Sequence, residues 1–259
     1  MEMGLQGRRA LLTGASKGMG RACAQAVARE GCEVTLVARG AAALEDAARD
    51  IRAETGATVQ TVCADITTAA GRAAALAACP APDILLNNAA GMKPGDFRDW
   101  TRETWIEALD LMMLAPIEMI RLTFDGMVSR GFGRVVNIAS RGVKIPQVDL
   151  GLSNGARTGL VGFCAGLARE GVARDVTINT ILPGIIASDG QRGHVQALAE
   201  RTGRSFDDIW AERAASSPAG RYGTPEEIGA LFAFLASQHS GRMTGQSILM
   251  DGGDYPGTL

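Results

Sequence analysis

The sequence predicts a single α/β domain built around a doubly wound sheet of parallel strands. Short apolar runs alternate with longer segments of helical periodicity, which is typical of successive βαβ units. The 33 glycines, against nine prolines and 5% aromatic residues, suit many tight turns between strands and helices. No linker-like change in composition divides the 259 residues, so we expect one domain over residues 1–259.

Seven short apolar runs, several of them rich in β-branched residues, are the expected strands. They span residues 8–13, 33–38, 58–63, 83–87, 133–139, 176–182 and 247–250. The expected helices span residues 20–30, 41–55, 67–78, 102–129, 150–171 and 225–237. Pro116 lies inside the longest of these helices and should bend or interrupt it, because proline has no N–H to donate.

Residues 188–223 break this alternation. The segment has helical signals but no strand, and it is richer in charged and polar residues than its surroundings. Ligands of open parallel sheets bind beyond the carboxyl ends of the strands, so an insertion that follows a strand is expected to be a helical lid. The alternative is a structural insertion of two helices with no role in binding.

Composition excludes several function classes. A net charge of -2 leaves no basic field for a phosphate backbone, so we expect no nucleic-acid partner. Five cysteines without a C-x-x-C pair and two distant histidines predict neither a disulfide framework nor a metal site. No stretch approaches the roughly 20 apolar residues that span a bilayer, and no signal-peptide pattern is visible. We therefore expect a cytoplasmic protein with no membrane partner.

A glycine-rich turn follows the first expected strand and opens a helix. Its sequence is Thr13-Gly14-Ala15-Ser16-Lys17-Gly18-Met19-Gly20. The glycines allow a tight turn and let backbone N–H groups approach a pyrophosphate at the positive end of the helix. The three glycines alone fit an ordinary turn equally well, but the order strand, loop, helix, strand favours a dinucleotide site. The sheet is therefore expected to be Rossmann-like.

Two cations lie near the expected cofactor ribose. Arg39 ends the second strand, where an acidic residue would accept hydrogen bonds from the ribose of NAD and an arginine would bind a 2′-phosphate. Lys17 adds a second positive charge within the glycine loop. The alternative for either residue is an ordinary solvated side chain. Together they favour NADP(H) over NAD(H).

These residues and several later motifs resemble the short-chain dehydrogenase/reductase family, and within it the 3-oxoacyl carrier-protein reductases, over nearly the whole chain. The later motifs are Asp65, Asn87-Asn88-Ala89-Ala90, Val136-Asn137-Ile138-Ala139-Ser140, Pro183-Gly184-Ile185-Ile186-Ala187-Ser188 and the segments 221–227 and 244–253. The resemblance implies a cofactor site made of Gly14, Ser16, Lys17, Gly18, Met19, Gly20, Arg39, Asp65, Ile66, Asn88, Ala89, Arg157, Pro183, Gly184, Ile186 and Ser188. It also implies a small carbonyl or alcohol substrate and a homotetramer or homodimer packed through the helices 102–129 and 150–171.

The catalytic tetrad that the resemblance implies is changed at three positions. Ser140 matches the family's serine, but Ser153 stands in place of the tyrosine, Arg157 in place of the lysine and Met112 in place of the asparagine. A serine hydroxyl is a far weaker acid than tyrosine, and an arginine with a pKa of roughly 12.5 or more relays no protons. Ser140 and Ser153 could still orient and polarise a carbonyl group. The proton must then come from elsewhere.

The lysines suggest another proton donor, because the chain contains only Lys17, Lys93 and Lys144, all expected at the carboxyl edge of the sheet. Our hypothesis is that Lys144, four residues after Ser140, or Lys93 assists the reacting oxygen. Solvated loop lysines are the alternative, and His194 in the expected lid is a rival proton source.

The sequence thus predicts an NADP(H)-dependent oxidoreductase that acts on a carbonyl/alcohol pair with non-standard proton transfer. Two alternatives stay open. One is non-redox chemistry, lyase-like or hydrolase-like, on the same scaffold. The other is a cofactor-binding protein without redox turnover, which loss of the tyrosine would explain.

Overall fold

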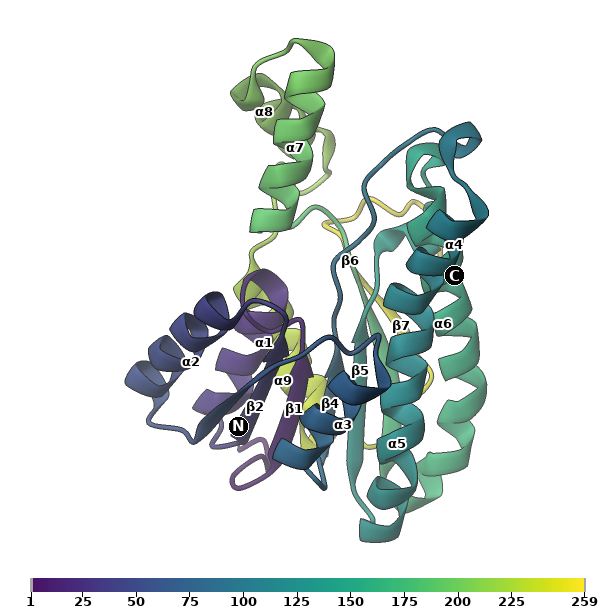
Figure 1. The fold of residues 1–259 in the computed structure, drawn as a ribbon. Helices are drawn as coiled ribbons and strands as arrows, with labels where there is room; N and C mark the ends of the chain where they lie inside the picture. Colours follow the sequence, from purple (N-terminus) through teal and green to yellow (C-terminus); the bar gives the residue numbers. More distant parts are fainter. Residues whose placement is uncertain (1, 259) are drawn as a thin grey trace.

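A computed structural model describes residues 2–258 and contains the predicted seven-stranded parallel sheet (Figure 1). Its strands are β1 (Arg9–Thr13), β2 (Glu33–Ala38), β3 (Val59–Cys63), β4 (Ile84–Asn87), β5 (Gly133–Ile138), β6 (Val176–Pro183) and β7 (Ser247–Met250). The strand order is β3-β2-β1-β4-β5-β6-β7, so the winding direction reverses between β1 and β4. A ligand crevice is expected beyond the carboxyl ends of the strands at this point.

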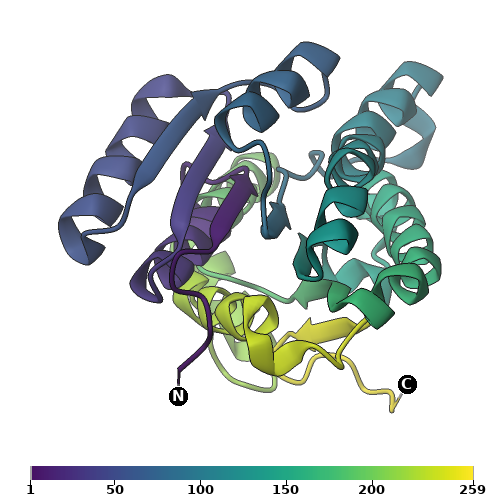
Figure 2. The same ribbon diagram turned by 90° about the horizontal axis from the view of Figure 1, so that it is seen from below.

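Helices cover both faces of the sheet (Figure 2). One face packs against α1 (Gly18–Arg29), α2 (Ala41–Thr55) and α9 (Pro225–Ala236), the other against α3 (Ala69–Ala78), α5 (Ala115–Arg130) and α6 (Gly151–Gly171). Two apolar cores result. Leu36 and Phe232 are fully buried in the first, and Leu11 and Ile178 in the second. The two cores hold the sheet in place beneath the loops that form the site.

The long helix expected over residues 102–129 is interrupted in the structure. It consists of α4 (Arg102–Leu109), a π-helical turn η2 (Asp110–Leu114) and α5. Pro116 explains the interruption that the sequence predicts at this place, because proline offers no N–H to the carbonyl of Met112.

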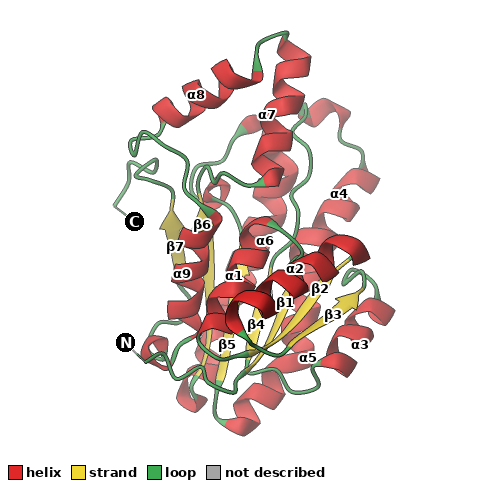
Figure 3. Ribbon diagram, turned by 90° about the vertical axis from the view of Figure 1, so that its left-hand side faces the viewer, coloured by secondary structure: helices red, strands yellow, loops and turns green. Residues whose placement is uncertain are grey.

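The segment 188–223 forms two helices, α7 (Asp189–Thr202) and α8 (Phe206–Ser216), which project beyond the carboxyl ends of the strands (Figures 1 and 3). Its ends are joined by an isolated parallel bridge between Ile186 and Gly223, with Ala187 N donating to Gly223 O at 2.8 Å. The two helices share a small apolar core around Val195 and Ile209. The helical content is as predicted, and the role as a lid stays a prediction.

Candidate functional site

The glycine loop is pressed against the end of β4. Gly14 has φ +58°, and a Cβ on it would lie 2.4 Å from the carbonyl oxygen of Asn88. A Cβ on Gly20 would lie 2.3 Å from the carbonyl oxygen of Gly14. Asn88 holds the loop in place, because its Nδ2 donates to Gly14 O at 2.9 Å and its N–H donates to Thr13 Oγ1 at 3.0 Å. Only glycine fits at positions 14 and 20.

The helix that follows this loop begins without a side-chain cap. Lys17 is the N-cap residue of α1 and makes no side-chain capping bond, and the first turn contains no acidic residue. The free backbone N–H groups at the start of α1 and the positive end of the helix dipole suit an anionic ligand. Gly18, with φ +55°, would bring a Cβ to 3.6 Å from the Cβ of Ser188, so the loop lies beside the base of α7.

The expected ribose site lies at the ends of β2 and β3. Arg39 and Lys17 are both exposed. Hydrogen bonds from the N–H and hydroxyl of Thr67 lower the pKa of Asp65, and the charge of Arg39 lowers it further. Ile66, next to Asp65, is buried. The structure therefore places Arg39 beside a carboxylate that stays ionised.

The end of β6 closes the crevice on the opposite side. Pro183 is the last residue of the strand, and Gly184 N donates to Met250 O at 3.0 Å. A Cβ on Gly184 would lie 2.7 Å from the Cα of Asp251, so the chain passes closely over the end of β7. Ile186 is buried, and Ser188 caps α7 by accepting from Gln191 N at 3.3 Å.

Arg157 is the best-fixed polar side chain of the predicted catalytic set. Arg157 is 7% exposed, and its guanidinium donates to Ile138 O at 2.8 Å, to Ala89 O at 3.3 Å and to Ser153 Oγ at 3.1 Å. Burial lowers its pKa to about 10. Arg157 thus ties the ends of β4 and β5 to α6 and orients Ser153.

Ser140 lies where β5 ends, facing the first turns of α6. Its Oγ accepts from Gly142 N at 3.0 Å. A Cβ on Gly142 would lie 3.3 Å from Ser140 Oγ and 2.6 Å from Asn154 Oδ1, so this loop packs closely on α6. Met112, which the sequence predicts at the position of the tetrad asparagine, is buried among Ala108, Leu152 and Ala156 and offers no hydrogen-bond donor.

The two lysines proposed as proton donors have different surroundings. Lys93 is exposed in the loop after β4, whereas Lys144 is half-buried with its Nζ 5.3 Å from the ring centroid of Tyr255. The C-terminal tail supplies this ring. Asp251 accepts from the N–H groups of Gly253 and Tyr255, each at 3.0 Å, and Asp254 pairs with Arg141.

Sequence analysis missed Tyr255 as a neighbour of the site. One signal was available, because the chain contains only two tyrosines and Tyr255 follows the last strand closely.

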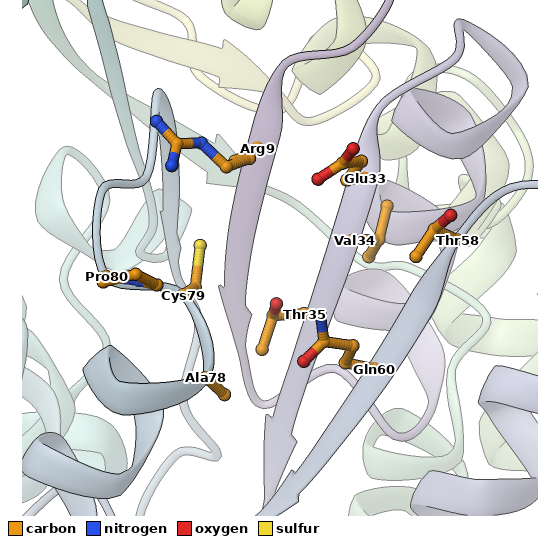
Figure 4. A pocket seen from close by; sticks show the side chains of 9 residues that line it. All are labelled: Arg9, Glu33, Val34, Thr35, Thr58, Gln60, Ala78, Cys79 and Pro80. Carbon is orange, nitrogen blue, oxygen red and sulfur yellow. The ribbon is translucent and has the colours of Figure 1, made fainter.

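Two cavities lie at opposite edges of the sheet. A cleft of about 490 Å³ opens between the loops after β4 and β5 and the end of α7, lined by Gly95, Asp96, Phe97, Arg98, Val148, Asp149 and Arg201. A smaller cavity of about 40 Å³, with Arg9, Glu33 and Cys79 in its lining, lies at the opposite edge of the sheet (Figure 4). None of the predicted site residues lines either cavity.

Residues 2–258 contain neither a cluster of metal-binding side chains nor a membrane-spanning helix. No group of three or more histidine, cysteine, aspartate or glutamate side chains could hold a metal ion there. No helix within this range is both long and apolar enough to cross a membrane.

Comparison with known proteins agrees with this geometry. Residues 14–254 match the family model described as enoyl-(acyl carrier protein) reductase. An acetoacetyl-CoA reductase of Shinella zoogloeoides is 34% identical over 96% of this chain and 98% of its own. A 3-oxoacyl-[acyl-carrier-protein] reductase of Vibrio harveyi is 31% identical over 98% and 99%.

A solved structure extends the likeness to the whole fold. The L-sorbose reductase of Gluconobacter frateurii, complexed with NADPH and L-sorbose, superposes with a TM-score of 0.94 at 29% identity over 100% of both chains. From its fold, its glycine loop and these relatives, the chain belongs to the short-chain dehydrogenase/reductase family of oxidoreductases.

Proposed function

We propose that the protein is an NADP(H)-dependent oxidoreductase for a carbonyl/alcohol pair, with proton transfer that uses neither the tyrosine nor the lysine of the family tetrad. The observation that carries the proposal is the glycine cradle. Gly14, Gly20 and Gly184 leave no space for a Cβ, and their backbone surrounds the crevice at the carboxyl edge of the sheet. These contacts hold the loop and the uncapped start of α1 where the winding direction of the sheet reverses, which is where sheets of this kind bind dinucleotides.

The cofactor is NADP(H), and the residues present fit it. The uncapped start of α1, with Ser16, Gly18 and Met19, would hold the pyrophosphate, and Lys17 and Arg39 would hold the 2′-phosphate. Asp65, Ile66, Asn88 and Ala89 would line the adenosine side, and Pro183, Gly184, Ile186, Ser188 and Arg157 the nicotinamide side. When bound, NADPH supplies a hydride to the substrate carbon.

Ser140 and Ser153 would orient the substrate carbonyl, with Arg157 as a positioning residue for Ser153. Arg157 keeps its protons at neutral pH even with a pKa of about 10, and its guanidinium is occupied by backbone carbonyls. The ammonium of Lys144 is the proposed donor: its proton passes to the substrate oxygen as the carbon is reduced, and solvent reprotonates the amine.

The lid and the assembly state are part of this proposal. Residues 188–223 would close over the substrate, since α7 follows the nicotinamide side of the crevice without a break. A homotetramer or homodimer would cover an apolar face of the long helices. Its exposed members are Ile106, Leu114, Leu122 and Phe163.

The first test is cofactor binding. Fluorescence titration with NADPH and NADH should give at least a tenfold preference for NADPH, because Arg39 and Lys17 pair with the extra phosphate. Arg39→Gln should remove most of this preference, while the exposed Arg49→Gln on α2 should keep it. No uptake of either nucleotide at millimolar concentration would contradict the proposal.

The second test is turnover. NADPH absorbance is followed with a panel of ketones, aldehydes and ketoses, and oxidation by any of them supports the proposed reaction. Lys144→Met should then lower kcat by about 100-fold, whereas Lys93→Met should not change it. Tyr255→Phe removes the hydroxyl of the tail tyrosine and keeps its ring beside Lys144. It therefore serves as the control for a contribution of the Tyr255 hydroxyl to turnover. Full activity of Lys144→Met would exclude this lysine as donor.

A second candidate function is cofactor binding without turnover. The changes at Met112, Ser153 and Arg157 favour it, because none of these side chains is a proton donor at neutral pH. Tight NADPH binding without oxidation across the whole panel would support this second function over the first.

A further inference from the structure

Hydrogen-bond donors without acceptors gather beneath the lid. The buried polar side-chain atoms there that lack a partner are Gln191 Nε2, Arg213 Nε, Ser217 Oγ and Tyr222 Oη. Each of the four groups can donate, and the amide and guanidinium nitrogens can do nothing else. Over residues 2–258, just two further buried side-chain atoms lack a partner, and both belong to strands of the sheet. The deficit of acceptors is therefore a local property of the lid.

Three of these groups form one cluster around Tyr222. Its side chain is 7% exposed, and its ring stacks on Trp210 of α8 with centroids 3.9 Å apart and planes at 15°. Burial raises the pKa of the Tyr222 hydroxyl, while the charge of Arg213 and hydrogen-bonding contacts from Arg213 and Gln191 lower it. Tyr222 Oη, Arg213 Nε and Gln191 Nε2 are thus neighbours, yet none has a partner in full hydrogen-bond geometry.

Positive charge adds to the unused donors. Arg141 lies in the loop directly after Ser140, and burial lowers its pKa, with the charge of Arg213 as the next contribution. The charge of Arg213 thus acts on Arg141, and the carboxylate of Asp251 acts on it in the opposite direction. Arg141 pairs with Asp254 of the tail, whereas Arg213 forms no ion pair with any residue in the range 2–258.

We propose that Arg213, Gln191 and Tyr222, with Arg141 opposite them, bind an oxyanion group of the substrate, either a carboxylate or a phosphate. The inference rests on the proposed function, because it places the anion on the molecule that is reduced. The oxygens of such a group accept only, so they supply what the cluster lacks, and charge-assisted hydrogen bonds to arginine are the stronger kind. Because Gln191 and Arg213 belong to the lid helices and Arg141 to the loop after β5, an anion bound by all three would also hold the lid closed.

An uncharged analogue should bind much more weakly, since it leaves these buried donors unpaired. The test uses NADPH-loaded protein and pairs of ketones that differ in charge. The carboxylate pairs are acetoacetate, 4-oxopentanoate and 5-oxohexanoate, each with its methyl ester. The three acids differ in the number of carbon atoms between the ketone and the carboxylate, so the series determines which spacing the site fits. The phosphate pair is dihydroxyacetone phosphate with dihydroxyacetone. Binding is measured by calorimetry and by tryptophan fluorescence.

We expect the charged member of at least one pair to bind about tenfold or more tightly than its neutral partner. The pair that shows the preference identifies the anion as a carboxylate or a phosphate. Equal affinities in every pair would overturn the proposal, and so would no binding of any probe at millimolar concentration.

Variants assign the preference to the cluster. Arg213→Gln should abolish it with unchanged NADPH affinity, and Tyr222→Phe, which keeps the ring stack, should reduce it severalfold. Arg204→Gln is the matched control, because Arg204 is an exposed arginine beside α8 that pairs with Glu212. A full preference in Arg213→Gln would overturn the proposed site.

Failure of this inference is distinguishable from failure of the proposed function. Loss of the function would appear as no NADPH uptake, or as uptake without oxidation by any carbonyl compound. Failure of the oxyanion site alone would appear as NADPH binding and oxidation with no preference for charged substrates.

Discussion

The cofactor side and the substrate side of the crevice are held in place by different means. On the cofactor side, positive φ angles and contacts too close for a Cβ fix the backbone at Gly14 and Gly20. On the substrate side, one buried side chain, Arg157, joins two strand ends to α6 through carbonyl acceptors. Backbone geometry allows few substitutions, whereas a proton can be delivered by more than one side chain. This difference is consistent with the proposal that the family pattern is kept at the glycine loop and changed at the predicted catalytic positions.

The largest effect is expected on the cofactor side, from Gly14→Ala. The new Cβ would lie 2.4 Å from Asn88 O in a left-handed backbone conformation, so we expect a loss of about 3 kcal/mol of unfolding free energy or more. NADPH affinity should fall with it. Gly193→Ala is the control, because a Cβ there meets no atom within 4 Å on α7. Denaturant unfolding and NADPH titration check both, and a native-like Gly14→Ala variant would show that the loop tolerates a side chain.

The next effect concerns the substrate side. Arg157→Met removes the donors to Ile138 O and Ala89 O and leaves both carbonyls without this partner, so we expect a loss of about 2–4 kcal/mol of unfolding free energy. Ser153→Ala removes a single acceptor from the same guanidinium and should cost about 1 kcal/mol. Denaturant unfolding of the two variants measures the difference. Equal losses would mean that the carbonyl contacts do not stabilise the fold.

Much of the fold could be predicted from the sequence because strands and helices leave local patterns. The runs at residues 33–38 and 247–250 match β2 and β7 at both ends, since turn residues bound them on each side. The break before Pro116 was also predictable, although its form, a π-helical turn, was not. That form depends on how α4 and α5 pack on α6, and packing across the sheet leaves no local pattern.

The assignment of site residues from motif spacing stays a prediction, and the contacts of those residues could not be predicted from the sequence. Motif spacing identified Arg157, but its carbonyl acceptors come from residues 19 and 68 positions away and meet it only at the sheet edge. Tyr255 belongs to a tail without periodicity, and its place beside Lys144 depends on Asp251 and Asp254 holding the tail. The donors around Tyr222 come from α7, from α8 and from the loop before α9. No local sequence pattern therefore predicts that they lie together.

The smallest effect is expected from His194 on α7, whose titration should make the stability of the protein depend on pH. Burial lowers the pKa of His194 on α7, and the charge of Arg213 lowers it further, so the folded protein binds this proton less readily than the unfolded chain. The free energy of unfolding therefore declines as the pH falls from above the ordinary histidine pKa of the unfolded chain toward the lowered pKa of the folded protein. Above the ordinary pKa this contribution is fully present. Thermal unfolding between pH 8 and 5 should show a shallower decline in His194→Gln. His239→Gln is the control, because that exposed ring contacts Glu2 O at the far end of the molecule. Identical pH profiles for the wild-type protein and His194→Gln would contradict the lowered pKa of His194.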